Sequence, residues 1–165
     1  MDGLQCYRYE LYDLIMAVEP KTYYTGGILV NDCIFCGIVG GKIPCAKVLE
    51  TDNVIAFLDI APVAKGHTLV IPKKHLANIL EMDIDLAADL HEAVQKVGRS
   101  MLASLKADGF NLGMNNFEAA GQLVMHAHYH IIPRYNGDEL KLWPQHSYDN
   151  EKEMEIYRSK IALIW

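Results

Sequence analysis

Apolar residues follow two different spacings along this 165-residue chain, and each spacing predicts a different kind of element. Between Asp85 and Leu105 they recur every three or four positions, which is the spacing of one face of an α-helix. The apolar positions of this face are Leu86, Leu90, Ala93, Val94, Val97, Met101 and Leu105. Asp83 or Asp85 can cap the start of the helix, and Asp108-Gly109 can end it. The pattern therefore predicts one long helix.

Shorter runs rich in β-branched and aromatic residues predict strands, bounded by turn residues such as Asp52-Asn53 or by Pro72. The predicted strands are Lys47–Glu50, Val54–Asp59, His67–Pro72, Phe110–Asn115 and Leu123–Arg134. Shorter helices are predicted at Arg8–Val18, at Asp32–Gly41 with Asp32 as its cap, and at Tyr148–Trp165. One long helix between the third and fourth strands favours an antiparallel sheet of about five strands with helices on one face. The expected fold class is α+β.

Composition and charge exclude some of the functions that this chain could have. The chain is 51% hydrophobic and 22% charged, which is ordinary for a globular protein, and its length suits one domain with an appendage. Its net charge of −6 argues against a general nucleic-acid binder, which would present a basic face. No stretch approaches the ~20 apolar residues of a membrane span, and the N-terminus does not resemble a signal peptide. We therefore expect a cytoplasmic protein with neither a nucleic-acid nor a membrane partner.

Three histidines, His126, His128 and His130, alternate with other residues in the run that follows Gly121. On a regular strand they would project from one face, with neighbours roughly 7 Å apart. The outer pair would lie roughly 13 Å apart, so one zinc ion could not bind all three without a bulge. A metal site and chance clustering are the alternatives. Because three of the seven histidines fall within five positions, we favour an active site.

The run from His126 to Ile132, preceded by Gly121-Gln122, resembles the signature of the histidine triad family of nucleotide hydrolases and transferases. The segment Gly66–His75 resembles a second characteristic segment of that family. The resemblance covers most of the chain, from Asp32 to Trp143. It implies an N-terminal extension over 1–31, a family domain over 32–145 and a C-terminal helical tail over 146–165. A homodimer is implied by the resemblance alone.

The resemblance also implies a nucleophile and its helpers. His128 would attack the α-phosphorus of a nucleotide and form a nucleotidyl-histidine, which water or another acceptor then resolves. His126, His130 and His67 would orient His128, contact phosphate oxygens and relay a proton to the leaving group. Taken alone, His67 beside Gly66 would more simply be a half-buried structural histidine.

A nucleotide needs contacts for its phosphate, ribose and base, and the resemblance assigns them to separate residues. The phosphate is assigned to side chains and backbone N–H groups of Asn115, Gly121, Gln122 and Val124. Many family members carry a hydroxyl residue where this chain has Leu123, which removes one phosphate contact. The ribose is assigned to the Asp59 carboxylate. The base is assigned to an apolar set, which in the absence of the resemblance would be core: Ile34, Phe35, Ile38, Ile43, Phe57, Leu58 and Ile60.

The Cys33-x-x-Cys36 pair is a further candidate for chemistry. Four cysteines are too few for a disulfide scaffold of this size, so the pair indicates metal or redox chemistry. Zinc-bearing members of the resembled family use such a pair with two histidines, and the matching positions are Cys33, Cys36, His75 and His126. Four protein ligands would close the coordination sphere, so this zinc would be structural. The redox alternative lacks a thioredoxin-like βαβ context.

The function implied by the resemblance is cleavage at the α-phosphate of purine nucleotide conjugates, with phosphoramidates as substrates. The leaving group could instead be a second nucleotide, as in a dinucleoside polyphosphate. Two other interpretations stay open. One is a nucleotide sensor with negligible turnover, and the other is a zinc-dependent hydrolase that uses the triad as metal ligands.

Overall fold

The structure of the protein is a computed structural model that describes residues 33–162. The described residues up to Glu139 belong to one compact unit, and residues 140–162 belong to another that is described by itself. The extension expected over 1–31, its predicted helix and the expected cap Asp32 lie outside the described residues. Within the described part, none of the helices combines the length and the apolar character that crossing a membrane requires.

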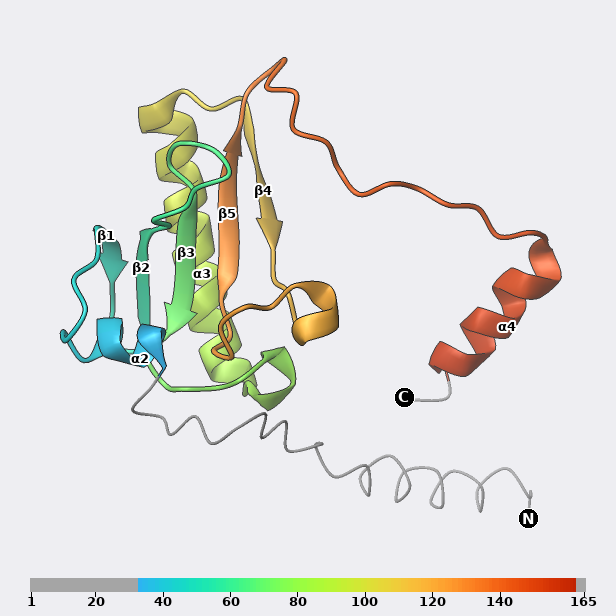
Figure 1. The fold of residues 1–165 in the computed structure, drawn as a ribbon, viewed down its shortest axis with the longest axis horizontal. Coiled ribbons are helices and arrows are strands. Elements are labelled where there is room, and N and C mark those ends of the chain that lie inside the picture. Colours follow the sequence, from blue (N-terminus) through green and yellow to red (C-terminus); the bar gives the residue numbers. More distant parts are fainter. Residues whose placement is uncertain (1–32, 163–165) are drawn as a thin grey trace, which may run out of the picture. The chain divides into compact units, whose positions relative to one another are not determined.

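Five strands form one antiparallel sheet (Figure 1). They are β1 (Lys47–Glu50), β2 (Val54–Leu58), β3 (Thr68–Pro72), β4 (Gly109–Gly113) and β5 (Tyr129–Arg134). The spatial order is β1-β2-β3-β5-β4, so the last strand lies between β3 and the edge strand β4. Each neighbouring pair is antiparallel. This confirms the predicted α+β class with five antiparallel strands and one long helix.

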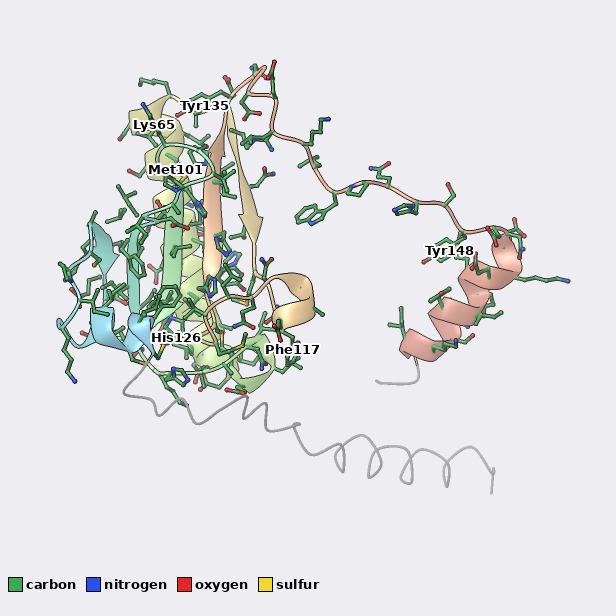
Figure 2. The ribbon with its side chains drawn as sticks, viewed as in Figure 1. Lys65, Met101, Phe117, His126, Tyr135 and Tyr148 are labelled. Carbon is green, nitrogen blue, oxygen red and sulfur yellow. The ribbon has the colours of Figure 1, made fainter. Side chains whose placement is uncertain are left out.

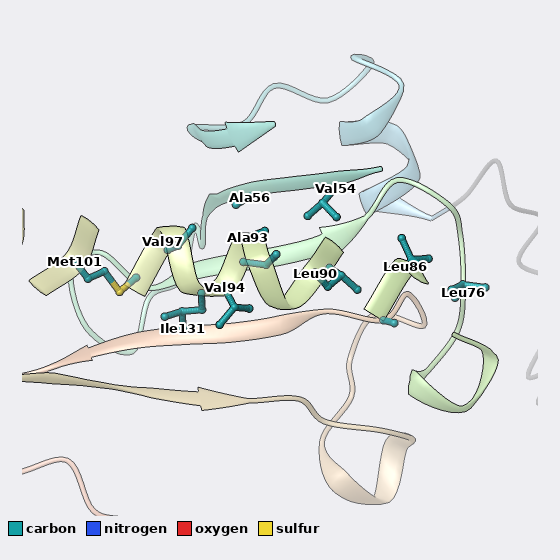
Figure 3. Packing of buried hydrophobic residues seen from close by; sticks show 12 residues of the cluster. Val54, Ala56, Leu76, Leu86, Leu90, Ala93, Val94, Val97, Met101 and Ile131 are labelled. Carbon is teal, nitrogen blue, oxygen red and sulfur yellow. The ribbon is translucent and has the colours of Figure 1, made fainter. Parts of the chain in front are cut away.

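The long helix α3 (Ile84–Ser100) covers one face of this sheet (Figures 1 and 3). Its N-cap is Asp83, whose side chain accepts a hydrogen bond from the N–H of Leu86. A π-helical turn, Met101–Leu105, continues the helix, which ends where Lys106 adopts a left-handed conformation with φ of 56°. Buried side chains of the helix, the sheet and two connecting segments form one cluster: Val54, Ala56, Val70, Leu76, Leu86, Leu90, Ala93, Val94, Val97, Met101, Ala127 and Ile131.

The opposite face of β2 and β3 is also buried, so these strands have apolar neighbours on both sides. The residues buried on this face form a second cluster: Ile55, Phe57, Leu69, Ile71, Cys33 and Phe35. The first four alternate along β2 and β3 with the residues that face α3, and the last two precede the sheet in sequence. Phe35 comes from the short helix α2 (Ile34–Val39), whose N-cap is Cys33. This face, with α2 beside it, carries the histidines described below.

The strand prediction for Leu123–Arg134 is wrong in its first half. β5 begins at Tyr129, so His126 and His128 precede the strand and only His130 lies within it. The three rings therefore do not stand in a regular row on one strand face, and the 13 Å separation expected from strand geometry does not apply.

Pro72 gives a physical reason for this difference. Pairing between β3 and β5 stops at the Val70–Tyr129 pair. Further along β3, Pro72 has no N–H with which to continue the ladder. Its carbonyl oxygen instead lies 2.9 Å from Nε2 of His126, which donates a hydrogen bond to it. The chain leaves the sheet where the ladder can no longer form.

Asp59 and His67, expected inside strands, lie just beyond the adjoining ends of β2 and β3. The N–H of Asp59 donates to the carbonyl of His67 over 2.9 Å, which closes the pair of strands at this end. The two side chains are therefore brought together by the antiparallel pairing itself.

The tail contains a helix, α4 (Glu151–Ala162), which begins three residues after the predicted start at Tyr148. Asn150 explains this start, because its side-chain oxygen accepts the N–H of Glu153 over 3.1 Å and so caps the helix. Residues 163–165, which were predicted to end this helix, lie outside the described part.

Candidate functional site

His128 is held in one tautomer by the backbone. Its side chain is buried, and its Nδ1 lies 2.6 Å from the carbonyl oxygen of His126. A carbonyl oxygen can only accept, so Nδ1 carries the proton and Nε2 keeps its lone pair. Burial is the main cause that lowers the pKa of His128 below its usual value. Near neutral pH the ring is therefore uncharged, with one nucleophilic nitrogen available.

Aromatic contacts fix the position of the His128 ring. Phe35 meets it edge-on, with 5.2 Å between ring centroids, and His130 lies at 4.8 Å. Phe35 also contacts the ring of His126 at 5.8 Å and that of Phe57 at 5.7 Å. Both phenylalanines are buried. Phe35 thus contacts two of the histidine rings from within the core, and Phe57 packs behind it.

His67 and His130 face each other, with 3.0 Å between Nε2 of His67 and Nδ1 of His130. The N–H of Val63 donates to Nδ1 of His67 over 3.3 Å. This contact places the proton of His67 on Nε2, which then donates to His130, and it leaves the proton of His130 on its own Nε2. Burial is the main cause that lowers the pKa of both rings, that of His130 to about 4, so both are neutral near pH 7.

Asp59 lies beside this histidine pair. Its Oδ2 is 3.5 Å from Nδ1 of His67, and its Oδ1 accepts the N–H of Ala61 over 2.8 Å. The carboxylate raises the pKa of His67, against the larger effect of burial. Because Asp59 keeps part of its side chain exposed, it can accept hydrogen bonds from a ligand as well as contact His67.

Two cysteines and two histidines bring their ligand atoms together: Cys33, Cys36, His75 and His126. Sγ of Cys36 lies 3.3 Å from Nδ1 of His75, and Sγ of Cys33 lies 3.5 Å from Nδ1 of His126. The two Nδ1 atoms are 3.3 Å apart. A tetrahedron with Zn–S near 2.3 Å and Zn–N near 2.1 Å has edges of about 3.4–3.8 Å. The four residues therefore fit one tetrahedral metal ion, and neither cysteine is in a disulfide.

A hydrogen bond from one ring nitrogen of His126 directs the other ring nitrogen toward these four ligand atoms. Nε2 donates to the carbonyl of Pro72, so Nδ1, which faces the sulfur atoms, keeps its lone pair. Burial lowers the pKa of His126 to about 4 and raises that of the Cys36 thiol to about 11, so a divalent cation would be needed to favour the thiolate.

Figure 2 shows His126 beside α2. Its carbonyl accepts from His128, so one residue joins the metal cluster to the candidate nucleophile.

Gln122 is turned inward. Its side chain is buried, and its Nε2 donates to the carbonyls of Ala77 (2.6 Å) and Val124 (3.1 Å). Its Oε1 accepts the N–H of Phe117 over 2.8 Å, and its own N–H donates to the carbonyl of Phe117. With these groups engaged inside the protein, Gln122 holds the loop in shape.

Replacing Gln122 with alanine is expected to lower the free energy of unfolding by about 3 kcal/mol, because three hydrogen bonds of a buried side chain are lost at about 1 kcal/mol each. Urea unfolding measures the change. Gln95→Ala on the exposed surface of α3 is the matched control and should shift stability by less than about 0.5 kcal/mol. Equal stabilities of the two variants would contradict the role given to Gln122.

The loop that follows Gln122 offers hydrogen-bond donors. Within the described part of the chain, the N–H groups of Leu123, Val124 and Met125 meet no protein acceptor. Asn115 lies beside Gly121, just before this loop, since its Nδ2 donates to the carbonyl of Gly121 over 3.4 Å. Consecutive backbone N–H groups of this kind can bind an anion.

The residues expected to bind the base do not share one environment. Phe35 and Phe57 are buried, and Ile38 packs partly against the same cluster. Others are exposed to solvent: Ile34, Ile43, Leu58 and Ile60. A surface hollow of about 350 Å³ lies elsewhere, with none of the candidate site residues in its lining: Asn53, Lys73, Lys74, Asp83, Asp85, Leu86 and Asp89. The structure thus brings the histidines and Asp59 together, and it places the residues expected at the base partly in the core and partly at the surface.

Two positioning groups were missed by sequence analysis. The carbonyl of Pro72 orients His126, and the N–H of Val63 contacts His67. Both are main-chain groups, which every sequence contains at these positions, so no pattern of residue types could have singled them out. Only the end of a strand at Pro72 could be predicted.

Comparisons with known proteins bear on this site. A model of the HIT domain matches residues 40–137. Protein hit from Bacillus subtilis is 48% identical over 135 residues, which cover 80% of this chain and 93% of that protein. Adenosine 5'-monophosphoramidase hnt1 from Schizosaccharomyces pombe is 44% identical over 123 residues, which cover 73% of this chain and 89% of that protein. The crystal structure of a zinc-bound histidine triad family protein from Mycobacterium smegmatis has a TM-score of 0.66 and 36% identity, and the match covers 81% of this chain and 96% of that one.

Proposed function

This chain belongs to the histidine triad family, and we propose that it cleaves purine nucleotide conjugates, phosphoramidates in particular, at the α-phosphate. The observation that carries the proposal is the hydrogen bond from Nδ1 of His128 to the carbonyl of His126, which leaves Nε2 available for attack. A relative named as an adenosine 5'-monophosphoramidase supports nucleotide hydrolase activity of this kind.

In the first step, Nε2 of His128 forms a bond to the α-phosphorus while the bond from phosphorus to the leaving nitrogen breaks. The leaving nitrogen takes the proton from Nε2 of His130. His130 regains a proton at Nδ1 from Nε2 of His67, and solvent protonates Nδ1 of His67 beside Asp59. Both rings stay neutral and only exchange tautomers, which suits their lowered pKa values.

In the second step, water attacks the phosphorus of the nucleotidyl-histidine and the bond to Nε2 of His128 breaks. The water proton passes to Nε2 of His130, which lost its proton in the first step. The relay then runs in reverse through His67, and the proton leaves near Asp59. The two histidines thus act as acid and then as base, and the site returns to its starting tautomers.

The nucleotide is proposed to bind across the neighbouring groups. The N–H groups of Leu123 and Val124, with Asn115, would receive the phosphate oxygens. Asp59 would accept from the ribose hydroxyls. Since the phenylalanines are buried, the apolar side chains left to cover the purine are those with exposed surface or partial burial: Ile34, Ile38, Leu58 and Ile60.

Zinc is the metal proposed for Cys33, Cys36, His75 and His126. Four protein ligands leave no open position for a substrate, so its part would be to fasten α2 to the segment that follows β3 and to the segment that precedes β5. We also propose a cytoplasmic homodimer. The edge strand β4 supports this, because its side chains Phe110 and Leu112 are 36% and 41% exposed.

An isotope experiment tests the reaction. Turnover of an adenosine phosphoramidate in H₂¹⁸O is expected to give AMP that carries one ¹⁸O and an unlabelled amine, because water enters at the α-phosphorus. A dinucleoside polyphosphate is assayed in parallel. A higher kcat/KM for the latter would assign the leaving group to a second nucleotide, and binding of AMP without turnover of either substrate would instead indicate a nucleotide sensor.

A further inference from the structure

A tight turn follows the end of β5, and its two central residues are Asn136 and Gly137. Figure 2 labels Tyr135 at the start of this turn. The N–H of Asp138 donates to the carbonyl of Tyr135 over 3.0 Å, which closes the turn. Gly137 has a φ of 82°, which glycine adopts without the steric cost that a side chain would bring. Both central residues are exposed, and they form the only Asn-Gly pair in the sequence.

The reactive groups of this pair are not engaged elsewhere in the protein. Across residues 33–162, the side-chain amide of Asn136 has no hydrogen-bond partner and the N–H of Gly137 has no acceptor. A Cβ added at Gly137 would meet nothing within 4 Å, so the space beside this residue is open. A turn closed by one hydrogen bond at an exposed loop tip opens at little cost. The backbone nitrogen of Gly137 can therefore approach Cγ of Asn136.

We propose that Asn136 is a site of spontaneous deamidation, which proceeds through a cyclic imide. The backbone nitrogen of Gly137 loses its proton to a base and forms a bond to Cγ of Asn136. The bond from Cγ to the side-chain nitrogen then breaks, and ammonia leaves. Water opens the imide at the side-chain carbonyl to give aspartate, or at the main-chain carbonyl to give isoaspartate. The net change consumes one water and releases one ammonia, so neither an oxidant nor a second protein is needed.

Isoaspartate changes the geometry of the turn, because the main chain then runs through the side-chain carbon and is one atom longer. Asp138 lies just after this point, and its two carboxylate oxygens accept from Nε and Nη2 of Arg134, each over 2.7 Å. Arg134 also donates to the side-chain oxygen of Asn111 in β4. A longer turn cannot keep both its closing hydrogen bond and this ion pair in their present positions.

Both products also add a negative charge at position 136. The carboxylate of Asp108 lies beside it, because its Oδ2 accepts the N–H of Asn136 over 2.8 Å. The N–H of Asp108 in turn donates to the carbonyl of Arg134 over 2.9 Å. Like charges repel at this separation. Deamidation is therefore expected to loosen the end of β5 from the start of the edge strand β4.

Peptide mapping of the full chain tests the proposal. The folded protein is incubated at mildly alkaline pH, and trypsin then releases residues 135–141 as one peptide. Mass spectrometry with electron-transfer fragmentation is expected to find aspartate and isoaspartate at position 136. Their rate of formation should rise with hydroxide concentration, because the attacking nitrogen must lose its proton. A sample digested before the incubation corrects for reaction during the digest.

Asn53 is the matched internal control, since it is also exposed. Its Nδ2 donates to Asp89 over 2.7 Å, and the N–H of the next residue, Val54, donates to Oγ1 of Thr51 over 3.1 Å. Both groups that must react are therefore engaged, and the side chain of Val54 crowds the attacking nitrogen. We expect Asn53 to keep its amide while Asn136 loses it.

An Asn136→Gln variant tests the effect on the fold. Glutamine keeps the amide but would have to close a larger ring, so this variant should stay unmodified. After incubation, the wild type is expected to unfold at a lower urea concentration than before, whereas the urea midpoint of the variant should not move.

The proposal is overturned if the peptide 135–141 keeps its amide in the folded protein, or if Asn53 reacts as fast as Asn136. A deamidated wild type with an unchanged urea midpoint would contradict the loosening of β5 from β4. These measurements need no nucleotide, so they stand or fall separately from the proposed function.

Discussion

A His128→Asn enzyme is expected to lose at least ~10³-fold in kcat for an adenosine phosphoramidate, as enzymes that lose their nucleophile do. The asparagine amide can occupy the place of Nδ1 and donate to the carbonyl of His126, so the loop keeps its hydrogen bond. What is lost is the nitrogen corresponding to Nε2. Single-turnover kinetics measure the loss, and AMP affinity should stay within a few-fold of the wild type.

Two other histidine variants serve as comparisons for the loss of kcat in His128→Asn. His91→Gln on the exposed surface of α3 should leave kcat unchanged. His130→Gln should lower kcat by about 10²-fold, as expected for loss of an acid–base group and not of a nucleophile. Comparable turnover by the wild type and His128→Asn would rule out the mechanism proposed here.

Cys36→Ser is expected to weaken zinc binding by about 10²-fold, which corresponds to about 2.7 kcal/mol of unfolding free energy in a zinc-saturated protein. The cause is loss of one of four ligands whose atoms lie within 4.8 Å of one another. Zinc content by atomic absorption and thermal unfolding measure the two effects. A chelator should lower the stability of the wild type first, and turnover should fall only as the protein unfolds.

Cys45→Ser is the matched control for this change. Cys45 is also a free, partly buried cysteine that packs near the same apolar cluster, but it is not among the four clustered ligands. Its replacement should leave zinc content intact. Equal zinc loss in both variants would contradict the assigned ligand set. Immediate loss of turnover on chelation, with folding intact, would instead favour a catalytic zinc.

The long helix and the central strands of this protein could be predicted from sequence patterns. The spacing from Leu86 to Met101 predicted α3 because one face of that helix is buried against the sheet. Strands β2 and β3 could be predicted because apolar residues fill both of their faces. Asp83 was one of two candidate caps, and its side chain accepts the N–H of Leu86.

The local course of the chain through the site could not be predicted from alternation. The spacing of the histidines is that of a strand, yet His126 and His128 lie before β5. Two long-range effects override the pattern: Pro72 cannot extend the ladder, and the ring of His126 contacts both the Pro72 carbonyl and the sulfur atoms of Cys33 and Cys36. Neither partner is near His126 in sequence, so no local window contains the signal.

The role of Gln122 shows a similar limit. Its place before the histidines suggested a ligand contact, whereas its buried side chain joins Ala77, Phe117 and Val124. A residue type and a position in a motif do not specify which way a side chain points. For His128, by contrast, the donor that fixes the tautomer is the backbone two residues earlier, so the motif itself carries the geometry.

The stereochemical course at phosphorus tests the central claim most directly. The substrate is an adenosine phosphorothioamidate of known configuration at the α-phosphorus, and it is turned over in H₂¹⁸O so that the product is chiral. Attack by Nε2 of His128 followed by attack of water gives two in-line inversions, so the account predicts net retention. Net inversion would mean that water displaces the leaving group in one step, and it would contradict a covalent intermediate on His128.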